Sequence, residues 1–189
     1  CLEVVLEQAP GGCASRLLCT RRTRLSHRGA AVHVGDRVRL EAIDPLQARA
    51  VVADVEPRRS WLSRPPVANV SLVAVALAVE QPGFDPDQAS RFLLTAERTG
   101  LEVLVLLTKT DLISTEEQSR IKSRLQGWGY EPLLLSSCSG DGITALRDRL
   151  ASSSLSVLCG PSGVGKSSLL NQLMPHLSLR TAAVSGKLQ

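Results

Sequence analysis

A glycine-rich run, GPSGVGKS at residues 160–167, lies near the C-terminal end of this chain of 189 residues. The apolar run at residues 155–159 precedes it and predicts a strand, and helical spacing follows from Ser168 to Met174. A strand, a glycine-rich turn and a helix are the setting in which backbone N–H groups bind phosphate at a helix N-terminus. The sequence therefore predicts a P-loop within an α/β domain.

The residues of this loop have distinct expected roles. Lys166 is expected to neutralise the β and γ phosphates, which makes it the candidate catalytic residue, and the Ser167 hydroxyl is expected to hold Mg²⁺. The candidate phosphate-binding residues are Gly160, Pro161, Ser162, Gly163, Val164, Gly165, Lys166, Ser167 and Ser168. A P-loop domain ordinarily opens with this loop, whereas most of this chain precedes it. Either another domain comes first, or the order of the nucleotide-binding elements is rotated.

The composition, with 43% hydrophobic and 21% charged residues, predicts a globular protein. No apolar run reaches the roughly 18 to 20 residues that a membrane span requires, and the first residues lack the features of a signal peptide. The five cysteines form no C-x-x-C pair, and no His–Cys cluster has metal-ligand spacing. We therefore expect a cytoplasmic monomer without a membrane partner, with a plastid as the alternative location.

Positive charge is concentrated in the first third of the chain. Residues 1–69 contain eleven arginines, no lysine and seven acidic residues, whereas residues 70–189 contain eleven residues of each sign. Guanidinium groups suit bidentate contact with phosphate, so this region is predicted to bind RNA; a solvated basic face is the alternative. The candidate RNA-binding residues are Arg21, Arg22, Arg24, Arg28, Arg37 and Arg39.

Residues 1–57 have the pattern of β-structure. Short runs with β-branched residues at 2–7, 16–20, 33–40 and 48–55 are separated by turn signals. About five short strands in this length predict a small barrel, and an oligonucleotide-binding (OB) fold is the natural basic candidate. Trp61 is the only aromatic residue among residues 1–69. Because single-strand binders usually stack bases on aromatic rings, contact with folded RNA through its backbone and shape is expected instead.

A linker is predicted at residues 58–69, where prolines and arginines predominate. Strands and helices alternate in residues 70–189: the runs 70–79, 101–107, 132–135 and 155–159 predict strands, and 86–98, 114–126 and 143–150 predict helices. Asp85 and Ser114 are the expected N-caps, the latter with Glu117 three residues further on. This alternation predicts a doubly wound parallel sheet.

Two further loops follow strands of the second domain. Thr108, Lys109, Thr110 and Asp111 come directly after residues 101–107. The Asp111 carboxylate can accept from guanine N1–H and from the exocyclic amine, a donor pair that adenine lacks, and the Lys109 stem can lie across the base. After residues 132–135 come Ser136 and Ser137, of which Ser137 N–H can donate to guanine O6. The three loops together predict a site for GTP or GDP with Mg²⁺.

The base-reading loops thus precede the P-loop in the chain, an order that resembles the circularly permuted GTPases of small-ribosomal-subunit biogenesis, the RsgA or YjeQ type. Further similarity lies in residues 34–38, 58–60, 64–70, 136–140, 160–171 and 179–188. The resemblance implies an OB barrel, a circularly permuted GTPase domain and a C-terminal domain that binds Zn²⁺. It also implies ribosome-stimulated GTP hydrolysis during late maturation of the 30S subunit, with rRNA bound through the barrel.

The chain departs from the family pattern at several points. Thr108 stands where the family commonly has Asn, and a hydroxyl forms fewer hydrogen bonds than an amide, so weaker nucleotide affinity is expected. Ser71 stands where the family often has Asp. Only 22 residues follow Ser167. The D-x-x-G loop, the water-activating residue, the zinc ligands and two strands are expected beyond Gln189. The domain at 70–189 is therefore expected to be incomplete at its C-terminus and poorly active.

Two alternative functions remain open at the level of sequence. The P-loop also resembles that of guanylate kinase, but a kinase has no tract like residues 108–111 upstream and needs a long region after the loop. The second alternative is a non-catalytic RNA-binding assembly factor, in which the nucleotide serves only as a conformational ligand. Nucleotide turnover separates this factor from an enzyme.

Overall fold

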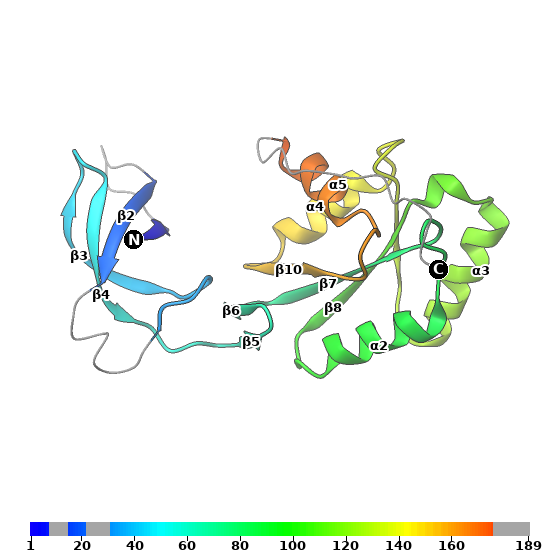
Figure 1. The fold of residues 1–189 in the computed structure, drawn as a ribbon, viewed down its shortest axis with the longest axis horizontal. Coiled ribbons are helices and arrows are strands. Elements are labelled where there is room, and N and C mark those ends of the chain that lie inside the picture. Colours follow the sequence, from blue (N-terminus) through cyan, green and yellow to red (C-terminus); the bar gives the residue numbers. More distant parts are fainter. Residues whose placement is uncertain (8–14, 22–30, 176–189) are drawn as a thin grey trace. The chain divides into compact units, whose positions relative to one another are not determined.

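The computed structural model describes residues 1–7, 15–21 and 31–175. The chain divides into two compact units, Cys1–Asn69 (unit 1) and Val70–Gln189 (unit 2), which Figure 1 shows with most elements labelled. The division falls where the sequence pattern changes from short strands to alternating strands and helices.

Unit 1 is rich in strands. β1 (Leu2–Val5), β2 (Arg16–Arg21), β4 (Arg49–Val55) and β3 (Val38–Asp44) form one sheet in the order β1-β2-β4-β3. Side chains alternate between the two faces of each strand, and one face forms a small core of Leu17, Cys19, Ala50 and Val52. The β-rich character of this region is as expected, although β3 begins later than the run at 33–40. The OB fold itself stays a prediction.

The structure differs from the expected linker at residues 58–69. β5 (Trp61–Ser63) and β6 (Pro66–Ala68) pair as an antiparallel hairpin. The segment is also tied to the rest of unit 1, because Asn69 Nδ2 donates to Gly35 O at 2.9 Å. The linker prediction is therefore wrong for these residues. Pro66 does not prevent a strand here, since it is the first residue of β6 in a two-stranded hairpin, a position at which proline is tolerated.

Unit 2 is built on a parallel sheet. β10 (Ser156–Cys159), β7 (Leu72–Ala78), β8 (Glu102–Thr108) and β9 (Leu133–Leu135) lie in this order, and each neighbouring pair is parallel. Every residue of β7 is buried, as predicted for a strand covered on both faces. The last described strand in the chain, β10, lies beside β7, the first strand of the unit.

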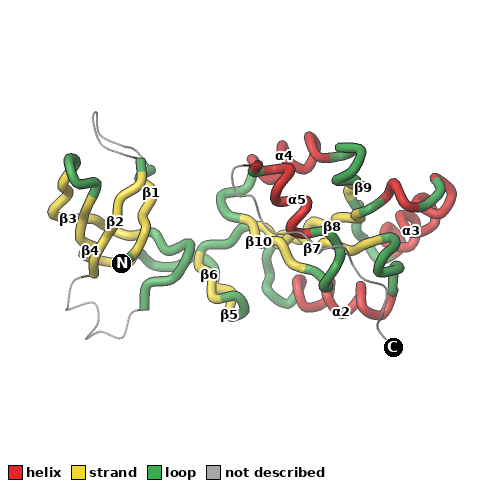
Figure 2. The backbone as a smooth tube through the Cα atoms, turned by 45° about the horizontal axis from the view of Figure 1, so that its top comes forward, coloured by secondary structure: helices red, strands yellow, loops and turns green. Residues whose placement is uncertain are grey.

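Helices cover both faces of this sheet (Figures 1 and 2). The side chains of Val73, Val75 and Leu77 pack with α2 (Pro86–Glu97) and α3 (Thr115–Gly127) on one face. On the other face, Ala74 and Ala76 pack with α4 (Ile143–Ala151) and α5 (Lys166–Leu173). The doubly wound arrangement predicted from the sequence is confirmed. Within the described ranges, no helix is both long and apolar enough to cross a membrane.

The local signals that begin these helices act as predicted. Asp85 Oδ1 accepts from Asp87 N at 2.9 Å at the start of α2, and Ser114 Oγ accepts from Glu117 N at 3.2 Å at the start of α3. Each bond satisfies one of the N–H groups that a helix N-terminus leaves without an intrahelical partner.

Ser71 has a structural role just before β7. Its hydroxyl donates to Leu155 O at 3.2 Å and accepts from Leu155 N at 3.3 Å. The Ser71 side chain therefore joins the start of β7 to the segment that leads into β10.

Candidate nucleotide-binding site

The three candidate loops lie at one edge of the parallel sheet. The P-loop follows β10, residues 108–111 include the end of β8 and the short helix η1 (Thr110–Leu112), and residues 136–140 follow β9. The crossover helices lie on one face after β7 and β8 and on the other face after β9 and β10. The winding therefore reverses between β10 and β7, which is where open α/β sheets bind their ligands.

The backbone of the P-loop depends on glycine. Gly160 has φ 140° and Gly165, the N-cap of α5, has φ 90°. A Cβ added to Gly160 would lie 2.1 Å from Ala76 O, so the loop leaves the sheet in direct contact with the backbone of β7. The turn then leads into the N-terminus of α5, whose first backbone N–H groups have no intrahelical acceptor and can bind phosphate oxygens.

Lys166 is the first residue of α5 and is partly buried. Its Nζ donates to Gly160 O at 2.9 Å and to Pro161 O at 2.6 Å, so the ammonium group is held inside the curve of the loop. Burial lowers the pKa of Lys166, and the neighbouring Cys159 thiol offsets part of this effect. An anionic phosphate bound beside the ammonium group would raise this pKa again, because it favours the charged form.

The first base-reading loop is tied directly to the P-loop. Thr108 is buried, and its Oγ1 donates to Val164 O at 2.6 Å. Leu77 O is a second, more distant acceptor for the same hydroxyl, at 3.3 Å. Lys109 has a left-handed conformation with φ 61°, and its Cε lies 4.0 Å from the position that a Cβ on Gly165 would take. Its Nζ donates to Gln81 O. The Thr108 hydroxyl therefore joins the two loops, a role that the comparison with Asn from sequence alone did not identify.

The carboxylate expected to read guanine is held by the second base-reading loop. Ser136 is fully buried, and its Oγ donates to Asp111 Oδ1 at 2.5 Å. The same Oγ accepts from Cys138 N at 3.2 Å and Ser139 N at 3.1 Å, which fixes the turn that contains Ser137. This bonding leaves the Asp111 carboxylate with further acceptor capacity, since an ionised carboxylate has about four lone-pair sites.

Thr110 supports the same two loops through hydrogen bonds to β9 and α3. Its Oγ1 donates to Leu135 O at 3.1 Å, the last residue of β9, and its carbonyl accepts from Gln118 Nε2 at 2.8 Å. Thr110 is buried. It therefore joins the ends of β8 and β9 and supports the loop, while its contact with a nucleotide stays a prediction.

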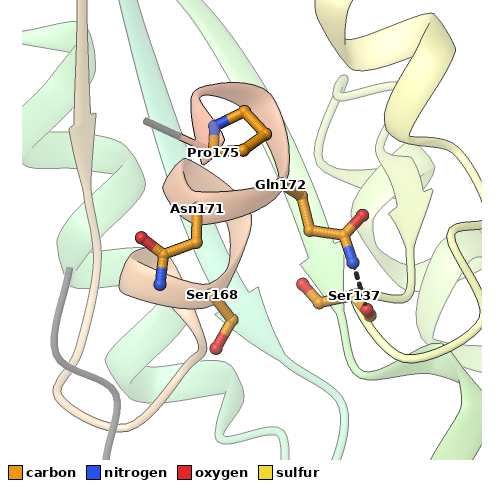
Figure 3. Close-up of a pocket in the computed structure, with 5 residues that line it drawn as sticks. All are labelled: Ser137, Ser168, Asn171, Gln172 and Pro175. Atoms are coloured by element: carbon orange, nitrogen blue, oxygen red, sulfur yellow. Dashed lines mark hydrogen bonds between the residues drawn. The ribbon is translucent and has the colours of Figure 1, made fainter. Parts of the chain in front are cut away.

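An open surface depression of about 520 Å³ lies between α5 and the second base-reading loop. Figure 3 shows the five residues that line it: Ser137, Ser168, Asn171, Gln172 and Pro175. Gln172 Nε2 donates to Ser137 O at 2.5 Å. A lining of hydroxyl and amide groups without charge suits the neutral nucleoside better than the phosphates. Sequence reasoning missed Gln172, although its spacing of four residues from Ser168 places both on one face of a helix.

We expect the Gln172 amide to hold the base-reading loop, and substitution tests this. Gln172→Met keeps the length of the side chain but removes the donor to Ser137 O. Affinity for GDP should fall about 3- to 10-fold, the value of one neutral hydrogen bond, while affinity for pyrophosphate, which has no base, should not change. Titration of both ligands by calorimetry measures the difference.

Gln126→Met is the matched control. Gln126 Nε2 donates to Glu131 Oε2 at 2.6 Å on the exposed side of α3, so this variant loses a comparable bond outside the site. Equal losses of GDP affinity in both variants would contradict a specific role for Gln172.

The loop offers one oxygen ligand for the expected Mg²⁺. Ser167 follows Lys166 in the first turn of α5. A single hydroxyl fits Mg²⁺, because this ion keeps several waters and binds chiefly to substrate phosphates in such sites. When bound, the ion neutralises charge on the β and γ phosphates. In the part of the chain that the structure describes, no group of three or more His, Cys, Asp or Glu side chains could hold a metal ion.

The candidate RNA-binding arginines are only partly placed. Arg22, Arg24 and Arg28 lie outside the described residues. Arg37 pairs with Glu7 at 3.0 Å and Arg39 with Asp54 at 3.6 Å, so the charge of each is partly neutralised. Arg21 is exposed at the end of β2.

Two comparisons of sequence place the chain among known proteins. A sequence model of the family described as RsgA GTPase matches residues 55–189. The small ribosomal subunit biogenesis GTPase RsgA of Synechococcus sp. (strain CC9605) is 77% identical over 188 residues, which cover 100% of this chain and 62% of that protein. The protein of the same name from Parasynechococcus marenigrum (strain WH8102) is 70% identical and is covered to 63%. The chain thus spans about three fifths of the length of these relatives.

Two solved structures resemble the fold. YjeQ from Thermotoga maritima superposes with a TM-score of 0.77 and 32% identity, covering 89% of this chain and 60% of that one. YloQ, described as a circularly permuted GTPase, superposes with a TM-score of 0.74 and 26% identity, covering 92% of this chain and 64% of that one. The permuted order of the loops is therefore shared with solved structures. Together with the family match over residues 55–189, these findings show that the chain belongs to the RsgA family of circularly permuted GTPases.

Proposed function

We propose that unit 2 binds GTP and GDP together with Mg²⁺ and hydrolyses GTP, and that the protein acts in late maturation of the small ribosomal subunit, where unit 1 contacts rRNA. The names of the relatives describe those proteins as small ribosomal subunit biogenesis GTPases. The charge of residues 1–69 supports contact with a polyanion.

The linkage between the three loops is the observation that carries the nucleotide site. Thr108 Oγ1 bonds to Val164 O, Ser136 Oγ to Asp111 Oδ1 and Gln172 Nε2 to Ser137 O. The phosphate-binding element therefore connects to the first base-reading loop, the first loop to the second, and the second back to the helix after the P-loop. Such mutual support holds the groups that would contact one nucleotide in fixed positions, which lowers the entropy lost on binding.

Each group has a chemical task in this proposal. Lys166 and the N-terminus of α5 neutralise charge on the β and γ phosphate oxygens as it shifts during phosphoryl transfer. Asp111 selects guanine, and the N–H of Ser137 donates to its O6. The γ phosphate is the group by which GTP and GDP differ, so its presence would favour docking on the ribosome and its loss would favour release.

The test uses the wild type and Lys166→Ala. GTP and GDP should bind the wild type with ATP failing to compete, and the substitution should reduce affinity on the order of 100-fold, as expected for loss of charged hydrogen bonds to phosphate. Turnover by the wild type should be slow without ribosomes, should rise when small ribosomal subunits are added and should be lost in the variant, while both proteins bind rRNA. Equal competition by ATP would refute the proposal. Retained rRNA binding without turnover in the wild type, even in the presence of small ribosomal subunits, would favour a non-catalytic assembly factor.

A further inference from the structure

Trp61 lies on the β5–β6 hairpin of unit 1 and is the only Phe, Tyr or Trp among residues 1–69. Of its surface, 42% is exposed. The Arg58 guanidinium lies over the indole ring, 4.6 Å from its centroid. The His33 ring meets the same indole edge-on, with centroids 4.8 Å apart and an interplanar angle of 63°. The ring is therefore oriented by two neighbours while a large part of it faces solvent.

Arg58 is itself fixed by an inaccessible carboxylate. Its Nε donates to Asp36 Oδ1 at 2.7 Å, and its Nη2 donates to Asp36 Oδ2 at 3.0 Å and to Ala31 O at 2.9 Å. The Asp36 side chain has 0% exposure and also accepts from His33 N at 2.8 Å. Burial by itself would raise the pKa of Asp36, but the hydrogen bonds from Arg58 and His33 outweigh this and leave the pKa lowered. The pair therefore stays charged at neutral pH, and the ring is preorganised.

Two further arginines lie close to Trp61 in the sequence. Arg59 and Arg64 are exposed, and neither forms an ion pair with any residue that the structure describes. No acidic residue occurs between positions 57 and 69. Arg37 and Arg39, by contrast, pair with Glu7 and Asp54. Arg59 and Arg64, which form no ion pair with a described residue, thus lie two and three positions from the exposed Trp61 in the chain.

We propose that the β5–β6 hairpin binds an unpaired RNA nucleotide, whose base stacks on the exposed part of Trp61 while Arg59 and Arg64 neutralise the flanking phosphates. This inference rests on the rRNA binding of the proposed function and names its surface. Every base has a π face, so stacking on an aromatic ring tolerates any sequence and strengthens binding about 5- to 100-fold per base. A single ring suffices for a single extruded base, which amends the expectation that unit 1 reads only backbone and shape.

The experiment compares Trp61→Leu with Trp128→Leu in the full chain. Trp128 is exposed to 40%, close to the value for Trp61, but lies at the end of α3 in unit 2, which makes it a matched control. The probe is a short single-stranded RNA with one central 2-aminopurine. Trp61→Leu should weaken binding about 10-fold and remove the change in 2-aminopurine fluorescence, Trp128→Leu should change affinity less than 2-fold, and Trp61→Phe should restore most of the binding. Replacing both Arg59 and Arg64 with Gln should reduce the slope of log Kd against log salt by about 1.4.

The outcomes separate this inference from the proposed function. If the wild type binds the probe and the two Trp→Leu variants bind it with equal affinity, the role of the hairpin is overturned. RNA binding elsewhere on unit 1 is then still compatible with the result. Failure of the wild type to bind the probe or rRNA at all would refute RNA binding by unit 1 as a whole. Displacement of the RNA by an acidic peptide at equal charge concentration would also overturn the inference, because a site for bases should prefer a ligand that stacks.

Discussion

Replacement of Asp111 by Asn is expected to move the nucleotide preference of this protein from guanine to xanthine. The Ser136 hydroxyl, which donates to Asp111 Oδ1 at 2.5 Å, would hold the oxygen of the new amide in the same place. The amide NH₂ would then occupy the position of the second carboxylate oxygen. It faces the exocyclic amine of guanine as donor against donor, but it can donate to the C2 carbonyl of xanthine, while the amide oxygen still accepts from N1–H.

The expected effect is large because two charge-assisted hydrogen bonds change together. Affinity for GDP should fall on the order of 10³-fold, and the xanthosine diphosphate should become the better ligand. Competition titrations with guanosine, xanthosine and inosine diphosphates measure the change. Asp141→Asn is the control, because the Asp141 carboxylate also accepts from a serine hydroxyl, that of Ser139 at 2.6 Å, in the neighbouring loop. If Asp111→Asn keeps the wild-type order of affinities, Asp111 does not read the base.

Most of unit 2 follows from short-range patterns in the sequence. The continuous apolar run that became β7 is typical of a strand buried on both faces, and every residue of Leu72–Ala78 is indeed buried. The N-caps Asp85 and Ser114 act within three residues of their own position, so local sequence identifies them. The order of the three loops along the chain is visible in the sequence itself. The permuted fold could therefore be predicted from the sequence.

Contacts between distant residues could not be predicted in the same way. Gln172 reaches Ser137 across 35 positions of the chain, and Thr108 reaches Val164 across 56. An amide or a hydroxyl in the sequence shows its capacity for hydrogen bonds but not its partner. Thr108 was therefore expected to weaken the site, whereas the structure shows it joining two loops.

The prediction of a linker at residues 58–69 was wrong for a related reason. Composition alone favours a linker there, because prolines and arginines disfavour regular structure on average. The hairpin forms through partners that lie elsewhere in unit 1, among them the bond of Asn69 to Gly35 and the pair of Arg58 with Asp36. Charge counts are subject to the same limit: Arg37 contributes to the basic excess of residues 1–69, yet the fold places it beside Glu7.

Gly160→Ala is expected to have the largest effect on the stability of unit 2. The new Cβ would lie 2.1 Å from Ala76 O and 3.1 Å from Ala76 C, and the residue would have to keep φ 140°. The backbone carbonyl of Ala76 cannot shift away from this Cβ without disturbing the sheet, because Ala76 lies in the middle of the buried strand β7. Backbone strain and overpacking together should cost on the order of 3–5 kcal/mol, which urea unfolding of unit 2 measures.

Gly127→Ala is the matched control for this substitution. Nothing lies within 4 Å of a Cβ at Gly127 and its φ is ordinary, so Ala should change the free energy of unfolding by less than about 1 kcal/mol, in the stabilising direction expected in a helix. If Gly160→Ala is as stable as this control, the P-loop does not leave the sheet in contact with β7. If instead it is destabilised but its folded form binds GDP as tightly as the wild type, the close approach serves the packing of β10 on β7 rather than the shape of the phosphate cradle.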